Sequence, residues 1–269
     1  MSDNDLVSRA RGEAFVGRRD ELAQLASAGA EVAGSGRGQM VVIAGDAGVG
    51  KSRLVQEFSD RVSRDGWTTA AGGCVDVAAG ALTYAALVEI LRHLDRRLGR
   101  DVMAELAGAG IDDLAPLLPG VPGGQPGAGG RLLERMLDFL VRLGEVASTA
   151  VVVEDLHWAD SSTRDLISFL ARNVHAARML LIVTYRADDL HRRHPLTSLL
   201  AELERGGASW IRLAGLARRD VAELVAQAAG AAAVQGVPLL LDRTGGNPFF
   251  IEELLAASNP YLVLRDRPG

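Results

Sequence analysis

The sequence predicts an α/β protein: a parallel five-stranded sheet flanked by helices, followed by a small helical subdomain. Short runs of apolar, often β-branched residues alternate with segments that have one apolar helical face, which is typical of a parallel sheet covered on both sides. After residue 213 the strand pattern stops, and only helical patterns follow. We therefore expect an α/β domain at 1–213 and a helical subdomain at 214–269.

Five segments are predicted to be strands. Each is a short apolar run, and the first is closed by a glycine. Cys74, the single cysteine, falls within the second run, where we expect it to serve as a small apolar residue. The predicted strands are 39–44, 68–75, 150–154, 179–185 and Ser209–Leu213.

Helices are predicted between these strands and after them. Lys51–Arg64 has its apolar residues on one face and charged residues opposite. The segment at about 76–148 is a long helical insertion, which we interpret as a tolerated surface insertion. Its Gly/Pro-rich stretch at 119–130 is expected to form a mobile loop. The C-terminal helices are predicted at 220–229, 239–242 and Pro248–Ala257.

Composition and charge argue against several classes of function. The net charge is −5 and the arginines are scattered, so direct DNA binding by this segment is not expected. No apolar run approaches the roughly 20 residues that span a bilayer, so no membrane partner is expected either. The N-terminus is polar and lacks a signal-like apolar core, which favours a cytoplasmic location.

The stretch from Gly45 to Ser52 reads G-D-A-G-V-G-K-S and matches the phosphate-binding loop pattern G-x-x-x-x-G-K-[ST]. It lies between a predicted strand and a predicted helix, which is the context this loop requires. Lys51 is the only lysine in the chain. Its compact ammonium can reach the β and γ phosphates where the broad guanidinium fork of arginine would not fit. Ser52 is expected to ligate Mg²⁺. The expected nucleotide-binding residues here are Gly45, Asp46, Ala47, Gly48, Val49, Gly50, Lys51, Ser52 and Arg53.

Two acids and an arginine follow other predicted strands at the same edge of the sheet. Glu154 and Asp155 are expected to hold Mg²⁺ and to orient the attacking water, and the sequence leaves open which acid does which. At this position in nucleotide-binding sites, the commoner order is a metal-facing Asp followed by a catalytic Glu. The shorter acid here stands at the position of the base, so we expect slow hydrolysis. Arg186 ends the fourth strand and is expected to contact the γ-phosphate.

These motifs resemble the signal-transduction ATPases with numerous domains, the STAND class of AAA+-related P-loop NTPases. Three runs occur in the family's order: F-V-G-R-R-D-E-L at 15–22, E-D-L-H-W-A-D at 154–160 and G-G-N-P-F-F-I-E-E-L at 245–254. More narrowly, the chain is similar to the ATPase module of the large ATP-binding LuxR-family transcriptional regulators and of related bacterial cyclase and kinase proteins.

The resemblance implies a P-loop NTPase fold of the ASCE/AAA+ type, in which the helical subdomain is a nucleotide-dependent lid. Val16, Gly17 and Arg18 would line the adenine end, Arg186 would act as the first sensor, and Pro248 would pack on the base or ribose. Family members continue beyond the lid, so the resemblance implies a fragment with a truncated lid, or a free-standing module. Self-association or binding to protein partners is expected in the full-length protein.

The sequence thus favours an ATP/ADP- and Mg²⁺-dependent switch domain of a bacterial signal-transduction or transcriptional regulator, with slow hydrolysis. Two alternatives stay open: a P-loop small-molecule kinase, and a non-hydrolysing interaction module that depends on ADP or ATP. His157 and Trp158 are expected to pack or to lead into the next helix, which Asp160 or Ser161 would cap.

Overall fold

The computed structural model describes residues 15–75, 83–108, 114, 117, 130–191 and 193–257. Its five strands form one parallel sheet in the order β2-β3-β4-β1-β5. The predicted fold class is therefore confirmed, and the strand ends differ by at most two residues from those expected from the apolar runs. The strands are β1 (Gln39–Gly45), β2 (Thr68–Gly73), β3 (Thr149–Glu154), β4 (Met179–Arg186) and β5 (Ser209–Leu213).

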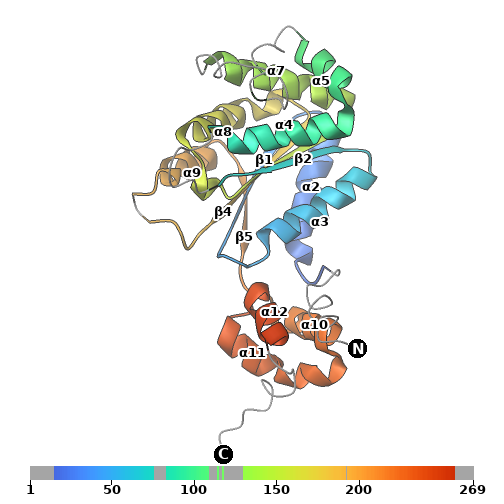
Figure 1. Ribbon diagram of the computed structural model, residues 1–269, viewed down its shortest axis with the longest axis vertical. Helices are drawn as coiled ribbons and strands as arrows, with labels where there is room; N and C mark the ends of the chain where they lie inside the picture. Colours follow the sequence, from blue (N-terminus) through green and yellow to red (C-terminus); the bar gives the residue numbers. More distant parts are fainter. Residues whose placement is uncertain are drawn as a thin grey trace, which may run out of the picture.

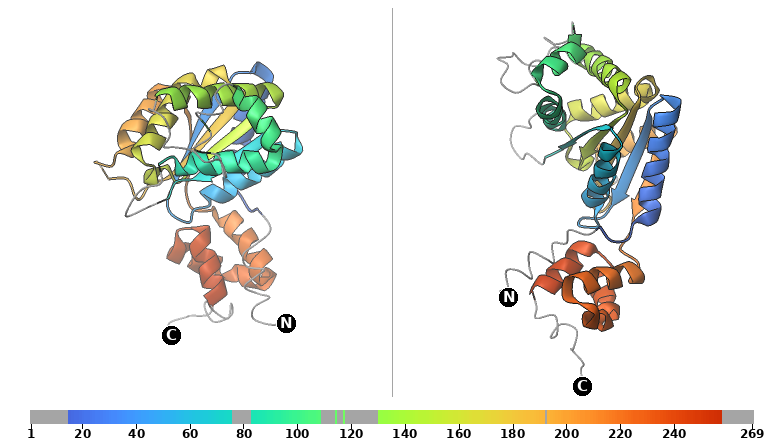
Figure 2. Two further views of the ribbon diagram at one scale, coloured as in Figure 1. Left: turned by 45° about the horizontal axis from the view of Figure 1, so that its top comes forward. Right: turned by 90° about the vertical axis from the view of Figure 1, so that its right-hand side faces the viewer.

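Side chains along each strand alternate between the two faces of the sheet, and each face has its own core. Val41 and Ile43 of β1 face one helical layer, and Met40 and Val42 face the other. Figure 2 shows the sheet between these layers. The first layer consists of α2 (Arg19–Ser35) and α3 (Lys51–Arg64). The second contains α4 (Ala85–Leu98), α5 (Arg100–Ala107), α7 (Gly130–Val146), α8 (Ser161–Asn173) and α9 (Leu196–Arg205).

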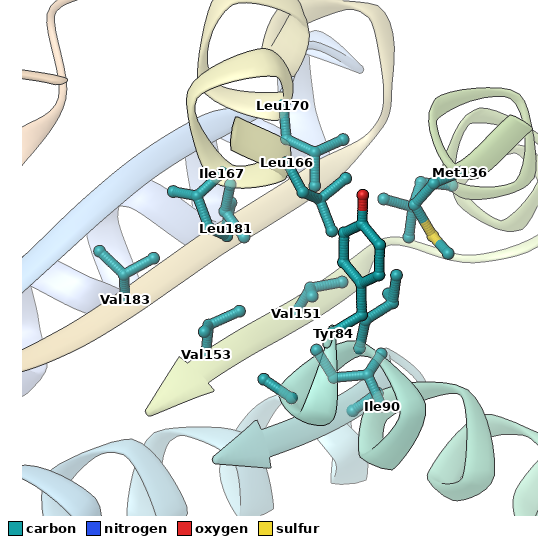
Figure 3. Packing of buried hydrophobic residues seen from close by; sticks show 14 of the residues in the cluster. Tyr84, Ile90, Met136, Val151, Val153, Leu166, Ile167, Leu170, Leu181 and Val183 are labelled. Atoms are coloured by element: carbon teal, nitrogen blue, oxygen red, sulfur yellow. The ribbon is translucent and has the colours of Figure 1, made fainter. Parts of the chain in front are cut away.

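The helices of the presumed surface insertion lie in the core instead. Ile90 of α4 and Met136 of α7 are almost fully buried and belong to the same cluster as Val151 and Val153 of β3 (Figure 3). This corrects the interpretation of a tolerated surface insertion, because the apolar faces of these helices cover the sheet. The Gly/Pro-rich stretch at 119–130 lies outside the described residues, apart from residue 130.

After β5 the described chain is helical and forms a separate cluster, which we call the lid (Figure 1). Val221, Leu240 and Ile251 are fully buried in its core, and Val16 from the start of the described chain joins them. All three predicted helices are present, and the second is longer than expected. The elements are α10 (Arg218–Ala229), the 3₁₀ helix η5 (Ala231–Gly236), α11 (Val237–Thr244) and α12 (Pro248–Ala257). Among the residues that the structure describes, none of the helices is long and apolar enough to cross a membrane.

Candidate functional site

The register of the sheet brings the predicted site residues to one edge. Gly45, the last residue of β1, pairs with Arg186, the last residue of β4. Glu154 ends β3 and pairs with Gly73 at the end of β2. Since all five strands are parallel, these carboxyl ends face the same side, where open α/β sheets bind their ligands. The phosphate-binding loop, the acidic pair and Arg186 are therefore neighbours in space.

The loop between β1 and α3 has the backbone of an anion cradle. Gly48 and Gly50 have φ values of +74° and +101°, a region that favours glycine. Lys51 is 7% exposed, and its Nζ donates to the carbonyl oxygens of Gly45 at 2.7 Å and Asp46 at 2.9 Å. Burial lowers the pKa of Lys51, although the nearby carboxylates oppose this effect. The ammonium thus lies across the loop, held by carbonyl groups.

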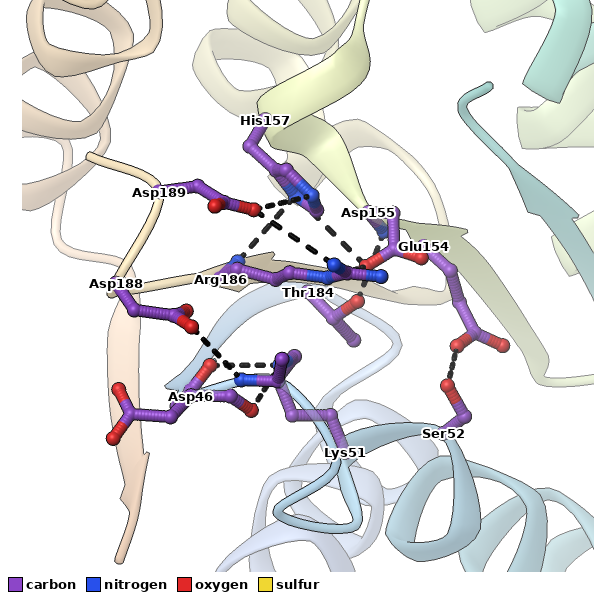
Figure 4. Close-up of polar contacts among 12 residues, drawn as sticks. Asp46, Lys51, Ser52, Glu154, Asp155, His157, Thr184, Arg186, Asp188 and Asp189 are labelled. Carbon is purple, nitrogen blue, oxygen red and sulfur yellow. Dashed lines mark hydrogen bonds and ion pairs between the residues drawn. The ribbon is translucent and has the colours of Figure 1, made fainter. Parts of the chain in front are cut away.

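The two acids at the end of β3, Glu154 and Asp155, face different partners (Figure 4). The carboxylate of Glu154 accepts a hydrogen bond from the hydroxyl of Ser52. Asp155 has a φ of +54°, and its N–H donates to Thr184 Oγ1 at 3.1 Å. Its Oδ1 lies 3.8 Å from Nε of Arg186. The sequence could not separate the two acids, and the structure pairs Glu154 with the loop and Asp155 with the arginine.

Arg186 has neighbours that sequence reasoning missed. Its guanidinium carbon lies 4.6 Å from the ring centroid of Trp158, and its Nη1 lies 3.9 Å from Asp189. Its backbone N–H donates to Nδ1 of the buried His157 at 3.4 Å. Asp188, two residues after Arg186, accepts a hydrogen bond from the N–H of Ala47 at 3.4 Å. The signal available in the sequence was the pair of aspartates, Asp188 and Asp189, one residue beyond the strand that ends in Arg186.

A cavity of about 420 Å³ lies where these groups meet, and the lid contributes to its wall through Leu216, Pro248 and Phe249. Most of the predicted nucleotide-binding residues line it: Val16, Arg18, Gly48, Val49, Gly50, Lys51, Ser52, Arg53 and Pro248, together with Asp155 and Arg186. Five predicted site residues lie outside the lining: Gly17, Gly45, Asp46, Ala47 and Glu154.

Arg18 and Gly17 join the loop to the lid. Arg18 Nη2 donates to the carbonyl oxygens of Val49 at 2.9 Å and Ala214 at 2.6 Å. Gly17 has a φ of +69°, and a Cβ placed on it would lie 2.9 Å from Cγ of Asp220 in α10. Arg18 therefore ties the phosphate-binding loop to the segment that leads from β5 into the lid, in addition to lining the cavity.

The groups available for a metal are oxygens. Within the described part of the chain, no cluster of three or more His, Cys, Asp or Glu side chains could hold a metal ion. The Ser52 hydroxyl and the Glu154 carboxylate nevertheless form the type of oxygen pair that suits Mg²⁺, which takes few protein ligands and keeps waters or phosphate oxygens.

Next to the site, Asp160 caps α8 by accepting a hydrogen bond from the N–H of Thr163 at 3.0 Å. Asp160 was one of the two residues predicted to cap this helix.

The chain is similar to several known proteins. An uncharacterized protein of Rhizobium meliloti (strain 1021) is 28% identical over 249 residues, which cover 82% of this chain and 23% of that protein. A STAND protein with a tetratricopeptide repeat sensor from Pyrococcus horikoshii has a TM-score of 0.53 at 18% identity, covering 92% of this chain and 30% of that one. The ORC2 protein of Aeropyrum pernix, solved as ADPNP and ADP complexes, has a TM-score of 0.56 at 16% identity. The match covers 93% of this chain and 64% of that one.

The two structural likenesses concern the fold, since both identities are low. The chain spans about a quarter of the length of the curated relative. The sequence pattern described as an AAA ATPase domain matches residues 14–183, which is more than half of the chain, and this protein therefore belongs to the AAA ATPase domain family.

Proposed function

We propose that this chain is a nucleotide switch module that binds ATP and ADP with Mg²⁺ in the cavity between the α/β domain (1–213) and the lid (214–269), and hydrolyses ATP slowly. One observation carries the proposal: the phosphate-binding loop, Asp155 and Arg186 line a single cavity that the lid also lines. A nucleotide bound there would contact both parts of the chain. Its β and γ phosphates would lie in the loop beside Lys51, which would exchange its two carbonyl contacts for phosphate oxygens.

The base would lie toward the lid. Val16, Leu216 and Pro248 present apolar surface at that end of the cavity, and a proline at the first turn of a helix offers a rigid face without an unsatisfied N–H. This arrangement supports the expectation that the lid senses the nucleotide. A module of this kind responds to whether the base and the phosphates are both in place.

The contacts of the two acids favour separate roles. Glu154 and Ser52 would hold Mg²⁺, whose charge would offset that of the phosphates. Asp155 would orient the attacking water and accept its proton, and Arg186 would contact the γ-phosphate. Asp155 is shorter than the glutamate that commonly serves as base, and Arg186 lies 3.8 Å from it, which supports slow turnover.

The length of the curated relative and the structural likeness support a proposal for the biological setting. The curated relative is about four times as long as the matched segment, and one structural neighbour carries a tetratricopeptide repeat sensor. We propose that this module acts inside a longer cytoplasmic bacterial regulator, in the manner of the LuxR-family proteins, with the sensor and output lying in other segments. Self-association or protein partners would operate in that longer chain, and we assign no DNA contact or membrane contact to this segment.

A nucleotide assay tests the proposal. Purified protein is incubated with labelled ATP and Mg²⁺, and both released phosphate and retained nucleotide are measured. Lys51→Ala should abolish nucleotide retention and phosphate release, and Asp155→Ala should abolish release while nucleotide is still retained. Arg172→Ala is the matched control, because Arg172 is an exposed cation paired with Glu202 away from the cavity. Absence of any ATP or ADP uptake by folded protein, measured by calorimetry, would overturn the proposal.

One alternative has an observation in its favour. Asp155 is the acid at the base position and already faces Arg186, so the module could retain ADP without turning over. Retained ADP with no phosphate release by the wild-type protein would identify this non-hydrolysing interaction module. Transfer of the labelled phosphate to an added metabolite would instead identify the kinase.

A further inference from the structure

Directly after the acidic pair, the chain makes one tight turn that places two aromatic rings beside Arg186. Asp155 adopts a left-handed conformation with a φ of +54°, and the 3₁₀ helix η3 (Leu156–Trp158) follows. The N–H of Trp158 closes the turn by donating to the carbonyl oxygen of Asp155 at 2.9 Å. The rings of His157 and Trp158 lie 4.6 Å apart, centroid to centroid.

The two rings contact different parts of the same arginine. His157 is 6% exposed, and its Nδ1 accepts the hydrogen bond from the backbone N–H of Arg186. This bond requires the proton of the neutral ring to be on Nε2, which lies 3.4 Å from the Asp189 carboxylate. Trp158 lies against the guanidinium, 4.6 Å from its carbon. One ring thus fixes the main chain of Arg186 and the other supports its charged end.

The carboxylates around the guanidinium are too far away to fix its position by themselves. Asp155 and Asp189 lie 3.8 Å and 3.9 Å from it, at the outer limit for an ion pair and beyond hydrogen-bond distance. The Arg186 side chain is 30% exposed, so water screens both pairs. A long arginine side chain with only such contacts would sample several rotamers. The indole face is the extended surface against which the guanidinium rests, through a cation–π contact.

We propose that His157 and Trp158 form a positioning pair that holds the Arg186 guanidinium at the phosphate end of the cavity. This inference rests on the proposed function. Neither ring lines the cavity, and both act through Arg186. The pair explains why the turn after the acidic residues has two rings in succession. The buried imidazole positions the backbone of Arg186, and the exposed indole positions its guanidinium.

The kinetic test separates positioning from simple packing. Trp158→Leu should lower kcat about fivefold, the effect of losing a contact of about 1 kcal/mol, while the affinity for ADP stays within twofold. Trp158→Phe keeps an aromatic face and should retain most of the turnover. Trp210→Leu is the matched control, because Trp210 packs edge-on against Tyr185, and neither residue lines the cavity. In an Arg186→Leu background, Trp158→Leu should have no further effect on kcat. Wild-type kinetics in Trp158→Leu, or additive losses in the double variant, would overturn the proposal.

The imidazole is tested with a matched pair of variants. His157→Asn offers a side-chain oxygen that can accept the bond from the Arg186 N–H, whereas His157→Leu fills the space without an acceptor. We expect His157→Asn to keep more of the turnover than His157→Leu at equal ADP affinity. Equal turnover in the two variants would show that the hydrogen bond to Arg186 is not what matters.

A fluorescence measurement tests the contact without relying on activity. The chain has three tryptophans, so in a Trp67→Phe/Trp210→Phe protein Trp158 is the one tryptophan left, and excitation at about 295 nm avoids the tyrosines. Without nucleotide, removal of the guanidinium in Arg186→Leu should raise the quenching of Trp158 by acrylamide, and unchanged quenching would overturn the proposed contact. Binding of a slowly hydrolysed ATP analogue should then change Trp158 emission only when Arg186 is present. If calorimetry shows no nucleotide uptake, the proposed function fails, and the quenching result still reports on the positioning pair.

Discussion

The side-chain amide of Asn247 in the lid donates a 2.8 Å hydrogen bond to the carbonyl oxygen of Ala47 in the phosphate-binding loop. The Oδ1 of the same side chain accepts from the N–H of Phe249 at 3.1 Å, which caps the start of α12. One residue therefore both begins the lid helix and ties it to the loop. A change in the loop when phosphates bind would reach α12 directly through this side chain.

Two substitutions separate the loop contact of Asn247 from its cap. Asn247→Asp keeps the acceptor for the Phe249 N–H and loses the donor to Ala47, so ADP should dissociate about two- to tenfold faster at nearly unchanged stability. Asn247→Ala loses both contacts, and its free energy of unfolding should also fall by about 1 kcal/mol. Stopped-flow release of a fluorescent ADP and thermal unfolding measure the two effects. Asn173→Ala is the control, since its amide donates to a helix carbonyl away from the cavity. Wild-type ADP release from Asn247→Asp would show that the loop contact does not hold the nucleotide.

Substitutions of Glu154 and Asp155 should affect turnover and its Mg²⁺ dependence in different ways. Glu154→Gln removes the negative charge next to Ser52, so the Mg²⁺ concentration for half-maximal turnover should rise severalfold. Asp155→Asn removes the proposed base, so kcat should fall by about 10²–10⁴ with the Mg²⁺ requirement unchanged. Mg²⁺ titrations of steady-state phosphate release measure both. The opposite pattern would exchange the two roles.

Alanine substitutions at Gly17 and Gly34 should change the free energy of unfolding in opposite directions. Gly17→Ala places a methyl group 2.9 Å from Cγ of the buried Asp220 at a φ of +69°, and should lower the free energy of unfolding by about 1–3 kcal/mol. Gly34 lies within α2 and has no atom within 4 Å of an added Cβ, so Gly34→Ala should raise it by up to about 1 kcal/mol. Urea denaturation measures both changes. A Gly17→Ala protein as stable as the wild type would mean that α10 can move away without cost.

Cys74 should be inert in the native protein. Burial raises the pKa of its thiol to about 12, and the nearby Asp160 and Asp155 add to this effect. The native protein at pH 8 should therefore resist iodoacetamide, whereas urea-unfolded protein should react. Because the unfolded thiol ionises near 9.0 and the folded thiol does not, its contribution to stability is complete below pH 9.0 and is lost between pH 9.0 and about 12. Cys74→Ala should show a shallower loss of stability over that window; an equal slope would contradict the shifted pKa.

Much of the α/β fold could be predicted because the evidence is local. Each strand is a short apolar run, and the phosphate-binding loop is a contiguous pattern between a strand and a helix. The helices α4 and α7 were also visible from their apolar faces, but the surface against which they pack was not. A helical face shows only that a partner exists. Here α4 lies mainly along β2, and the buried cluster that α4 and α7 join also contains Val151 and Val153 of β3.

The contacts that tune the candidate site lay beyond sequence reasoning for the same reason. Arg18 and Ala214 are 196 residues apart, and Asn247 and Ala47 are 200 apart. His157 and Arg186 meet because neighbouring strands β3 and β4 end at the same edge of the sheet. Without the strand order, nothing in the sequence connects an aromatic pair after one strand with an arginine at the end of another.

The burial of α4 and α7 restricts how this protein could be miniaturised. Excision of residues 83–146 would remove α4, α5 and α7 from the cluster that contains Val151 and Val153, and would leave apolar side chains of β2 and β3 less covered on that face. The same strand ends in Glu154, so looser packing against β3 would also affect the acid beside Ser52. A trimmed protein of this kind would tend to aggregate, and engineering of smaller variants should begin elsewhere.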